Sequence, residues 1–448
     1  MAKNGARAKS GGTIEAGQEA DKKSVRAQLS IAGSRSRVRL FSLVGSILLV
    51  TGIWVMQRSF GTVGLVVILA SAFIVVYVPL AVLQLLFLQR NSSYIRQEAA
   101  NTPLRPIVSG RRVLSVITTN GQNPEVVDKI IDVLKTYVLP GPFEVRVLVE
   151  EKDPFVYRAP TIRVPSDYQT PNRSILKMRA LHFFSEWLRT ERCGSETYVV
   201  HLDDDSVPSE DYLQWVYRMT EEAGQGNVRL REHGSHLFST MADLVRVSDC
   251  CAWCVTFNRR GKPMAVHGEG LVIRADVESA LGWDFATYGA DDFLMGQKLV
   301  HEGKTFGCIP HEIYIAPPTS AMDFYRQRRR WLISILWARR EAHALRPIAI
   351  DWVLYRYLVG WLGFFGVGLF LYGLIFRPPI PLPIELLGLF NFGSYLTFYL
   401  YGAAQTKRSY FWLIMVLLIP VALFEGGTLL YSVIFPPDPK VFYVIRKV

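Results

Sequence analysis

Runs of apolar and polar residues divide the chain into a central soluble part and flanking apolar parts. Between residues 91 and 346, short β-rich runs alternate with stretches of helical periodicity, a pattern that predicts an α/β domain on a mostly parallel sheet. The segments on either side contain apolar runs as long as helices that cross a membrane. Ligands of such sheets bind where the strands end, so the polar residues after each strand are the candidates for function.

Three strands and four helices stand out in the central part. The strands are predicted at residues 112–119, 143–149 and 198–202, and the helices at 126–139, 177–188, 293–300 and 321–336. The fold class that we predict is therefore α/β, with a Rossmann-like domain at 91–346 embedded between N- and C-terminal transmembrane helices.

The flanking parts favour an integral membrane protein. Residues 1–37 are rich in Gly, Ser, Lys and Arg and lack apolar periodicity, which is typical of a disordered tail. We expect a hairpin of two membrane helices at 38–90, with apolar runs at 39–57 and 63–88, and a C-terminal transmembrane region at 347–448 with candidate spans at 352–376, 384–402 and 411–435. Pro420 and Glu425 interrupt the last segment, so a re-entrant hairpin is an alternative to a full span.

Positive charge places the soluble domain on the cytoplasmic side. The net charge is +11, and basic residues crowd both the N-terminal tail and the segment 326–340 before the C-terminal apolar region. Such clusters are retained in the cytoplasm and attract anionic membrane lipids. Nucleic-acid binding is the rival explanation, but the sequence has no recognition motif for it.

The five cysteines are too sparse for a disulfide framework and indicate a reducing compartment. Cys251 and Cys254 have the spacing of a metal or redox pair. No second ligand pair follows at the spacing of a zinc site, so ordinary buried thiols are the simpler interpretation.

An aspartate triplet follows the strand at 198–202 and predicts a cation site. If strand geometry continues, Asp203 and Asp205 point to the same side, whereas Asp204 points elsewhere. Two carboxylates that leave room for phosphate oxygens suit Mg²⁺ or Mn²⁺; a plain turn at the strand end is the alternative. His201 and His311 are further possible metal ligands, and a structural role explains each of them as well.

A second pair of carboxylates, Asp291 and Asp292, stands at the start of the helix predicted at 293–300. Aspartate caps helices routinely. It also serves as a general base, and a sugar hydroxyl must lose its proton as it attacks an anomeric carbon. Both roles are compatible, since a capping carboxylate can still reach a substrate.

The segment Gln327-Arg-Arg-Arg-Trp331 lies in the last predicted helix of the central part. Arginine forks bind diphosphates and offset the charge of a leaving group, and Trp331 can stack on a sugar ring. The alternative is an interfacial helix with its arginines at lipid headgroups, which we favour for Arg328 and Arg329. Gln327, Arg330 and Trp331 share one helix face and are the better candidates for catalysis.

Other polar residues at strand ends complete the candidate site. Lys177 can touch phosphate or be a solvated surface lysine, and Gly268-Glu269-Gly270 can let a substrate approach the backbone or form a hairpin turn. Residues that can meet the nucleotide, with a plain turn as the alternative, are Thr118, Asn120, Glu150 and Asp153.

These motifs together resemble the family 2 inverting glycosyltransferases, which have the GT-A fold, over about residues 110–340. The resemblance implies a cation at Asp203 and Asp205, a base at Asp292, and a donor and acceptor clamp formed by Gln327, Arg330 and Trp331. It also places Asp204, Lys177 and Arg330 at the donor, and Gly268, Glu269, Gly270 and Trp331 at the acceptor.

A narrower resemblance is to the egghead-type β-1,4-mannosyltransferases. It rests on Val164-Pro-x-x-Tyr168, Lys177-x-Arg-Ala-Leu181, His201-Leu-Asp203, Arg246-Val-Ser-Asp249 and Gln327-Arg-x-Arg-Trp331. It implies GDP-mannose as donor, a lipid-linked glycan as acceptor, and Mn²⁺ or Mg²⁺ as cofactor. The chain departs from that group in its Asp-Asp-Asp triplet and in the segment 266–270, which leaves the sugar and the acceptor open.

The sequence therefore predicts a membrane-integral, metal-dependent glycosyltransferase with a cytoplasmic active site. A processive polysaccharide synthase that uses a UDP-sugar is the first alternative, although about five membrane segments are few for a secretion channel. A transporter or membrane scaffold with a degenerate domain is the second, and the intact Asp203, Asp205, Asp292 and Arg330 argue against it.

Overall fold

The computed structural model describes residues 76–231, 236–287, 289–376, 382–406 and 411–437, together with residues 58 and 64. The chain divides into two compact units. One unit, residues 1–65 and 433–436, lies almost wholly outside the described residues, as do the expected tail at 1–37 and the apolar segment at 39–57. The other, residues 66–432 with 437–448, contains the described fold below.

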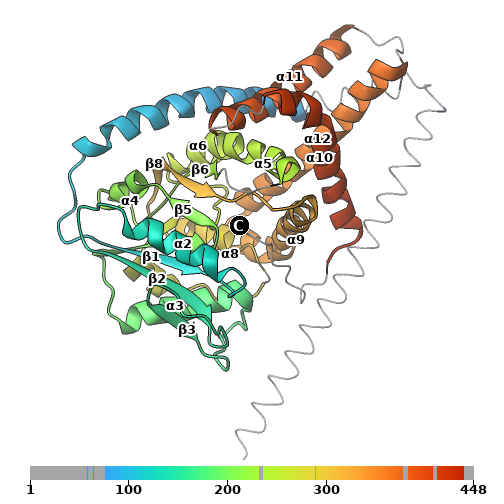
Figure 1. The fold of residues 1–448 in the computed structure, drawn as a ribbon. Coiled ribbons are helices and arrows are strands. Elements are labelled where there is room, and N and C mark those ends of the chain that lie inside the picture. Colours follow the sequence, from blue (N-terminus) through green and yellow to red (C-terminus); the bar gives the residue numbers. More distant parts are fainter. Residues whose placement is uncertain are drawn as a thin grey trace, which may run out of the picture. The chain divides into compact units, whose positions relative to one another are not determined.

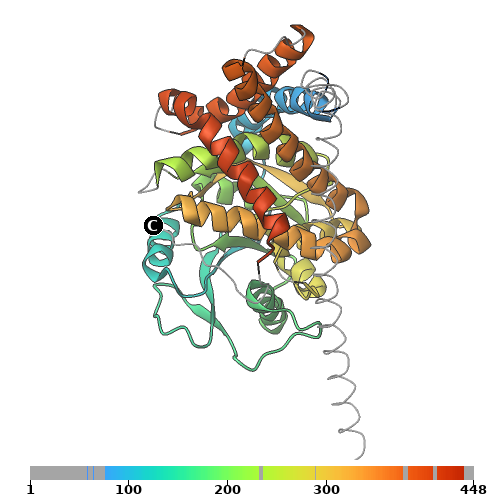
Figure 2. The ribbon, with the colours of Figure 1, turned by 90° about the vertical axis from the view of Figure 1, so that its right-hand side faces the viewer.

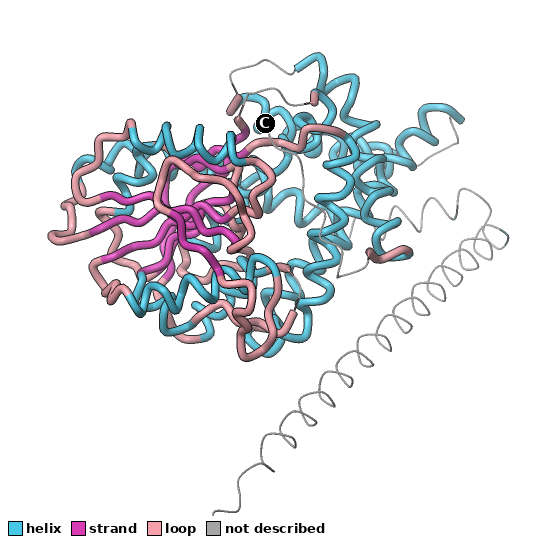
Figure 3. The backbone as a smooth tube through the Cα atoms, turned by 60° about the horizontal axis from the view of Figure 1, so that its bottom comes forward, coloured by secondary structure: helices cyan, strands magenta, loops and turns pink. Residues whose placement is uncertain are grey.

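An eight-stranded mixed sheet organises this unit, with helices on both of its faces (Figure 3). The strand order is β3-β2-β1-β4-β7-β6-β8-β5. The bounds are β1 Arg112–Thr118, β2 Phe143–Glu150, β3 Thr161–Val164, β4 Thr197–Asp203, β5 Ser206–Pro208, β6 Ala223–Leu230, β7 Leu271–Arg274 and β8 Phe306–Ile315.

The sheet is mostly parallel, as expected, and β6 and β8 in its second half are also parallel to each other. Strands β3, β2, β1 and β4 are all parallel, but β7 runs antiparallel to both β4 and β6, and β5 runs antiparallel to β8. Strand β7 enters the sheet through the loop 259–270, which follows the short helix α6 (Val255–Asn258). Sequence periodicity predicted β1, β2 and β4 and none of the other five strands.

Successive side chains of β1 point to opposite faces of the sheet, and each face has its own hydrophobic core. Val113 and Ile117 face one hydrophobic cluster, while Leu114 and Val116 face the other, as period-two geometry requires. The first cluster includes side chains of α2 (Pro124–Lys135), α4 (Glu210–Val216) and α5 (Leu237–Asp249). The second includes α3 (Leu176–Thr190), α7 (Ala275–Leu281) and α8 (Asp291–His301).

Helix α9 (Ala321–Leu345) follows the last long strand and leads into three apolar helices, α10 (Pro347–Phe376), α11 (Leu382–Ala404) and α12 (Phe411–Ile434) (Figures 1 and 2). Their positions match the expected C-terminal spans. Helix α12 continues through Pro420 as one helix, so the re-entrant alternative is not what this segment forms.

Among the described residues, one helix is long and apolar enough to cross a membrane, Trp412–Ile434, with a mean hydropathy of 2.2. The expected domain bounds at 38–90, 91–346 and 347–448 stay predictions.

Helices α5 and α11 touch backbone to backbone. A Cβ built on Gly402 of α11 would lie 2.2 Å from the carbonyl oxygen of Leu244 in α5, so only glycine fits there. Tyr399 of α11 and Ile414 of α12 belong to the same hydrophobic cluster as Leu244. The C-terminal helices therefore share the core of the sheet domain.

Candidate functional site

The ends of β1, β2 and β4 meet at one edge of the sheet, as expected for a ligand site of parallel strands. Thr118, the last residue of β1, lies in register with Asp203, the last residue of β4. The hydroxyl of Thr119 donates a hydrogen bond of 3.3 Å to Oδ2 of Asp204. The site is thus assembled from loops that follow three neighbouring strands.

The aspartate triplet is a turn and not a continuing strand. Strand β4 ends at Asp203, Asp204 and Asp205 form the turn, and β5 begins at Ser206. The premise that strand geometry aligns Asp203 with Asp205 was therefore wrong, because the chain reverses to pair β5 with β8. Asp204 accepts hydrogen bonds from Thr119 and Asn123, and the hydroxyl of Ser206 donates to Oδ1 of Asp205.

Lys177 joins the two acidic motifs. Its Nζ lies 2.9 Å from Oδ1 of Asp203, 3.3 Å from Oδ2 of Asp291 and 3.4 Å from Oδ1 of Asp292. The side chain of Lys177 is 27% exposed and has three carboxylate partners, so it is not a solvated surface lysine; its contact with phosphate stays a prediction. The structure brings together the predicted metal-binding strand end and the predicted base around one ammonium group.

Unusual backbone conformations place these side chains. Leu176, directly before Lys177, has a φ of 56°, and Ala290, directly before Asp291, has a φ of 58°. Gly289 precedes Ala290 with a φ of 74°. Non-glycine residues rarely adopt this region, and such residues concentrate at functional sites, where the surrounding structure holds them. Both helices that carry the cluster thus begin with a strained residue.

The charges of this cluster are unbalanced, because three carboxylates surround one ammonium. Burial disfavours the charge of Lys177, but Asp203, Asp291 and Asp292 outweigh it and raise the pKa of Lys177 well above its ordinary value. Burial and the neighbouring Asp291 raise the pKa of Asp292 well above that of an ordinary aspartate, against the effect of Lys177. A carboxylate in such surroundings is a better proton acceptor than one in water.

The loop 259–270 packs against the candidate base. A Cβ built on Gly268 would lie 2.6 Å from Oδ2 of Asp292, so the absence of a side chain lets the loop backbone reach the carboxylate. The next residue, Glu269, accepts a hydrogen bond of 3.1 Å from Nη2 of Arg246. Gly270 has a φ of 71°, and its carbonyl accepts a hydrogen bond from the hydroxyl of the buried Tyr212.

Arg246 leads from this loop to the tryptophan of α9. Its Cζ lies 4.6 Å from the ring centroid of Trp331, and the Cζ of Arg328 lies 4.5 Å from the same centroid. Burial opposes the charge of Arg246, but Asp243 and Glu269, with a smaller contribution from Asp205, raise its pKa. Trp331 therefore contacts two arginines, and one of them is linked through Glu269 to the loop beside Asp292.

Arg328 does not face lipid headgroups, so that interpretation was wrong for this residue. Its side chain is only 6% exposed, its Nη2 lies 2.6 Å from Oδ1 of Asp243, and its Nε lies 3.0 Å from Oε1 of Glu425 in α12. It also donates a hydrogen bond to Oε1 of Gln327. A helical pattern does not reveal a buried arginine whose partners come from α5 and α12.

Arg330 is half-buried on the same helix, and its backbone carbonyl accepts a hydrogen bond from the hydroxyl of Ser334.

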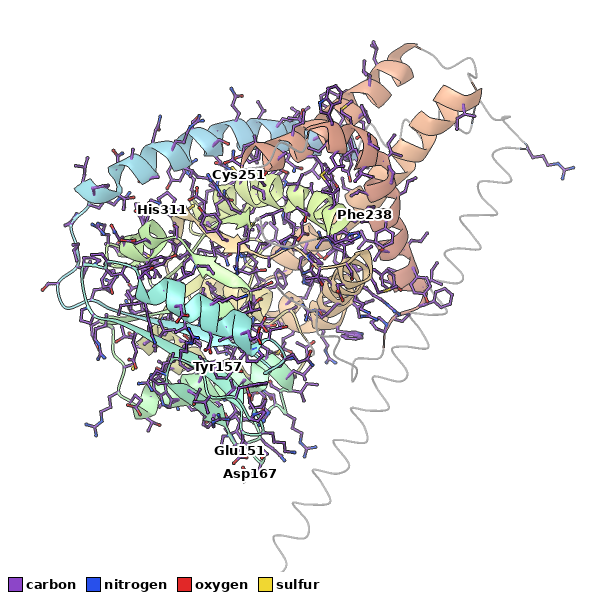
Figure 4. The ribbon with its side chains drawn as sticks, viewed as in Figure 1. Glu151, Tyr157, Asp167, Phe238, Cys251 and His311 are labelled. Atoms are coloured by element: carbon purple, nitrogen blue, oxygen red, sulfur yellow. The ribbon has the colours of Figure 1, made fainter. Side chains whose placement is uncertain are left out.

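The residues proposed for the nucleotide lie at neighbouring strand ends but have structural partners. Glu150, at the end of β2, forms an ion pair with Arg179. Asp153 is buried and accepts hydrogen bonds from the hydroxyl of Tyr157 and the backbone of Phe155. A Cβ on Gly121 would lie 2.9 Å from Cγ of Asp153, so the loop after β1 reaches Asp153. Figure 4 shows Tyr157 and Glu151 in this lower part of the ribbon.

Of the other predicted residues at this edge, Asn120 accepts a hydrogen bond from the backbone of Gln122 and is exposed. These strand-end residues keep their places near the expected donor site. Their roles toward a nucleotide stay predictions.

Among the contacts of the described residues, neither His201 nor His311 meets the aspartate cluster. Nε2 of His311 lies 2.7 Å from the hydroxyl of Thr102, and its ring meets Trp215 edge to face. Nε2 of His201 lies 3.0 Å from Oε2 of Glu278, a carboxylate that also accepts from Trp283. These contacts give both histidines structural roles, as the alternative interpretation held. His311 is therefore not among the ligands of the metal site proposed below.

Residues 198–425 match the family described as glycosyl transferase family group 2. The match covers half of the chain and includes the aspartate triplet, Asp291-Asp292 and the Gln327–Trp331 segment. The chain therefore belongs to this family, whose members are glycosyltransferases.

Curated relatives of the chain include two β-1,4-mannosyltransferases. The egh protein of Drosophila melanogaster is 28% identical over 184 residues, which are 39% of this chain and 40% of that protein. The bre-3 protein of Caenorhabditis elegans is 25% identical over 188 residues, which are 40% of this chain and 41% of that protein. The matched region thus spans about two fifths of the length of these curated relatives.

Among solved structures, a mannosyltransferase from Pyrobaculum calidifontis in complex with GDP-Man and Mn²⁺ is 15% identical. The superposition covers 83% of this chain and 100% of that chain, with a TM-score of 0.48.

Proposed function

We propose that the chain is a membrane-integral inverting glycosyltransferase that moves mannose from GDP-mannose to a lipid-linked or other membrane-associated glycan. The observation that carries the proposal is the convergence of Asp203, Asp291 and Asp292 on Lys177. Family membership supports glycosyl transfer, and the names of the curated relatives support mannose and a β-1,4 linkage.

The charge of the cluster supports a divalent cation there. With all four groups ionised, three carboxylates and one ammonium carry a net charge of −2, and the side chain of Asp203 is 29% exposed. Carboxylate oxygens are the donors that Mn²⁺ and Mg²⁺ prefer. Asp203 and Asp205 would hold the cation, which when bound offsets the charge of the leaving nucleoside diphosphate.

Asp292 serves as the base in this proposal. Its raised pKa brings the carboxyl nearer to neutral pH, where it can accept the proton of an attacking hydroxyl. Lys177 fixes the carboxylate from one side, and the backbone of Gly268 limits it from another. The carboxylate can then present one oxygen toward an acceptor, which is the orientation that in-line attack requires.

Gln327, Arg330 and Trp331 complete the proposed site on α9. The two arginines at Trp331 hold its ring in place, so that the ring can position a sugar. Arg330 would contact the diphosphate and offset its charge as the bond to the sugar breaks. The acceptor would approach along Gly268, Glu269 and Gly270.

Nucleotide release by the purified full chain in detergent with native lipid tests the proposal. The donors are GDP-mannose, UDP-glucose, UDP-GlcNAc and UDP-glucuronate, each with Mn²⁺, Mg²⁺ or EDTA. EDTA-sensitive release from GDP-mannose, absent in Asp292→Asn but present in Asp211→Asn, is the expected result. Asp211 is the matched control because it is an exposed acid in the first turn of α4.

Two other outcomes would overturn parts of the proposal. Release from a UDP-sugar with a ladder of growing product would identify a processive synthase instead. Equal release by the wild type and Asp292→Asn would remove Asp292 as the base.

A further inference from the structure

A second cluster of ligand-type side chains lies next to the candidate active site. The Sγ atoms of Cys250 and Cys254 and a ring nitrogen of His267 all lie within 4.8 Å of one another. Two thiols and an imidazole are the donor set that thiophilic cations select, in contrast to the oxygen donors of the aspartate cluster. We propose that Cys250, Cys254 and His267 form a Zn²⁺ site that fixes the loop 259–270 beside the catalytic base.

A π-helical turn brings the two cysteines together. The backbone N–H of Val255 bonds to the carbonyl of Cys250, five residues back, and the turn η2 spans Cys250–Cys254. Residues four apart then project to nearly the same side of the helix axis, and such turns concentrate at functional sites. The converging pair is therefore Cys250 and Cys254, and not the Cys251–Cys254 pair that the sequence spacing suggested.

Cys251 points to a different environment. Its sulfur contacts the hydroxyls of Tyr401, at 3.2 Å, and Ser92, at 3.7 Å. Ser92 belongs to the helix through residues 76–101, under which Figure 4 places Cys251. This cysteine therefore provides a matched control within the same turn.

The distance between the donor atoms fits zinc. Zn–S bonds of about 2.3 Å and Zn–N bonds of about 2.0 Å, at a tetrahedral angle, separate sulfur from nitrogen by about 3.5 Å. Sγ of Cys250 lies 3.5 Å from Nε2 of His267. The two ligands that come from distant elements thus already have the spacing of a tetrahedral site, with a fourth position for a water molecule.

The imidazole is oriented as metal-binding histidines are. Nδ1 of His267 lies 3.0 Å from the carbonyl oxygen of Glu269 and 3.3 Å from its Oε2, so a hydrogen on Nδ1 is held and Nε2 faces the thiols. A carboxylate behind the histidine is the usual outer partner of a zinc ligand. The fully buried Gln225 also bonds to the backbone N–H and carbonyl of His267.

The site would act on the active site through the loop that it anchors. Glu269, which holds His267, also binds Arg246, and Arg246 lies over Trp331. Gly268, between His267 and Glu269, lies against Asp292. A bound zinc ion would make His267 a fixed point, and the loop could not withdraw from the base without breaking a metal–ligand bond. His267 is thus a positioning residue.

Metal content of the full chain tests the proposal. The protein is purified in detergent without added metal and its zinc is measured by mass spectrometry. We expect one zinc ion per chain in the wild type, in Cys251→Ser and in Asp203→Asn, and a loss of zinc in Cys254→Ser and His267→Gln. Asp203→Asn separates this site from the proposed Mn²⁺ or Mg²⁺ site, so its zinc content does not depend on the proposed function.

A second measurement covers variants that fail to fold. Co²⁺ is substituted into the wild-type protein, and thiolate ligation gives sulfur-to-cobalt charge-transfer absorption in the near ultraviolet. Cys250 and Cys254 should then resist alkylation until a chelator is added, whereas the half-exposed Cys193 should react throughout. A folded wild type with neither zinc nor a charge-transfer band, or zinc retained in Cys254→Ser, overturns the proposal.

Discussion

Nζ of Lys177, at the start of α3, lies 2.9 Å from Oδ1 of Asp203, at the end of β4. This contact places a cation of the protein itself among the carboxylates that we propose for metal binding and catalysis. The same ammonium also reaches Asp291 and Asp292, so one cation contacts both acidic motifs. Lys177 therefore links the two acidic motifs that we propose for the donor and for the base, a contact that its sequence environment did not indicate.

Replacing Lys177 by methionine should move the activity to higher pH. The ammonium lowers the pKa of Asp292, so its loss leaves burial and Asp291 unopposed and the base stays protonated further up the pH scale. We expect a fall in kcat of about 10²-fold at neutral pH, partly recovered in alkaline buffer. Lys152→Met, at an exposed lysine, is the control and should keep the wild-type profile. A uniform loss at every pH would contradict this role.

Asp292→Asn should remove activity and stabilise the fold. The pKa of Asp292 is raised in the folded state, so the protonated form stabilises the fold. This stability is complete below the pKa of the unfolded chain, about 4, and is lost as pH rises through the raised pKa of the folded state. Asparagine resembles the protonated acid. Thermal unfolding in detergent without divalent cation should therefore give a higher Tm for Asp292→Asn than for the wild type at neutral pH, with the gap closing in acid.

Activity of Asp292→Asn should fall by about 10²–10⁴-fold, with GDP-mannose binding retained, because a base acts on the acceptor and not on the donor. Asp211→Asn should leave both activity and Tm at wild-type values. A lower Tm for Asp292→Asn at neutral pH would refute the raised pKa.

Arg328→Met should be strongly destabilising. It leaves the carboxylate of Asp243, which is fully buried, without its 2.6 Å partner and also breaks the contact with Glu425. Removing one partner of a buried pair costs about 3–5 kcal/mol. Arg326→Met is the matched control on the same helix, because Arg326 is 43% exposed and its contact with Asp323 is 3.6 Å long. It should cost less than about 1 kcal/mol. Equal losses of Tm in the two variants would contradict the buried network.

Gly268→Ala should impair turnover without unfolding the chain. The new methyl group would lie 2.6 Å from Oδ2 of Asp292, so the base or the loop must shift. A displacement of a reacting group by about 1 Å costs about 10²-fold in rate. Gly393→Ala, where a Cβ meets nothing within 4 Å, is the control. Steady-state kinetics should show a fall in kcat for Gly268→Ala only, with Tm close to the wild type.

Local sequence patterns predicted the elements that carry chemistry and missed the contacts that join them. Strands β1, β2 and β4 and helices α3, α8 and α9 lie within a few residues of their expected places, except that α9 extends to Leu345. Their hydrophobic periods are long and regular. Strand β7 has only four residues and pairs antiparallel with a strand about 70 positions earlier, which no local pattern encodes.

The site shows the same division. Asp203, Asp292 and Trp331 were predicted because each stands in a short motif with its own chemistry. Arg328, Glu425 and His267 were not, because their meaning depends on partners from distant elements. The aspartate triplet follows the predicted strand, as expected, but the expected alignment of Asp203 and Asp205 was wrong because the strand ends at Asp203.

The approach of Gly402 to the carbonyl of Leu244 limits how this protein can be divided or shortened. At Gly402 the backbones of α5 and α11 meet with no side chain between them, so a truncated gene that stops before α11 would expose the apolar face of α5 to water. Attempts to express the catalytic part alone should therefore yield aggregates. In evolutionary terms, α11 is not an interchangeable anchor, because any replacement would need a glycine at the same crossing point.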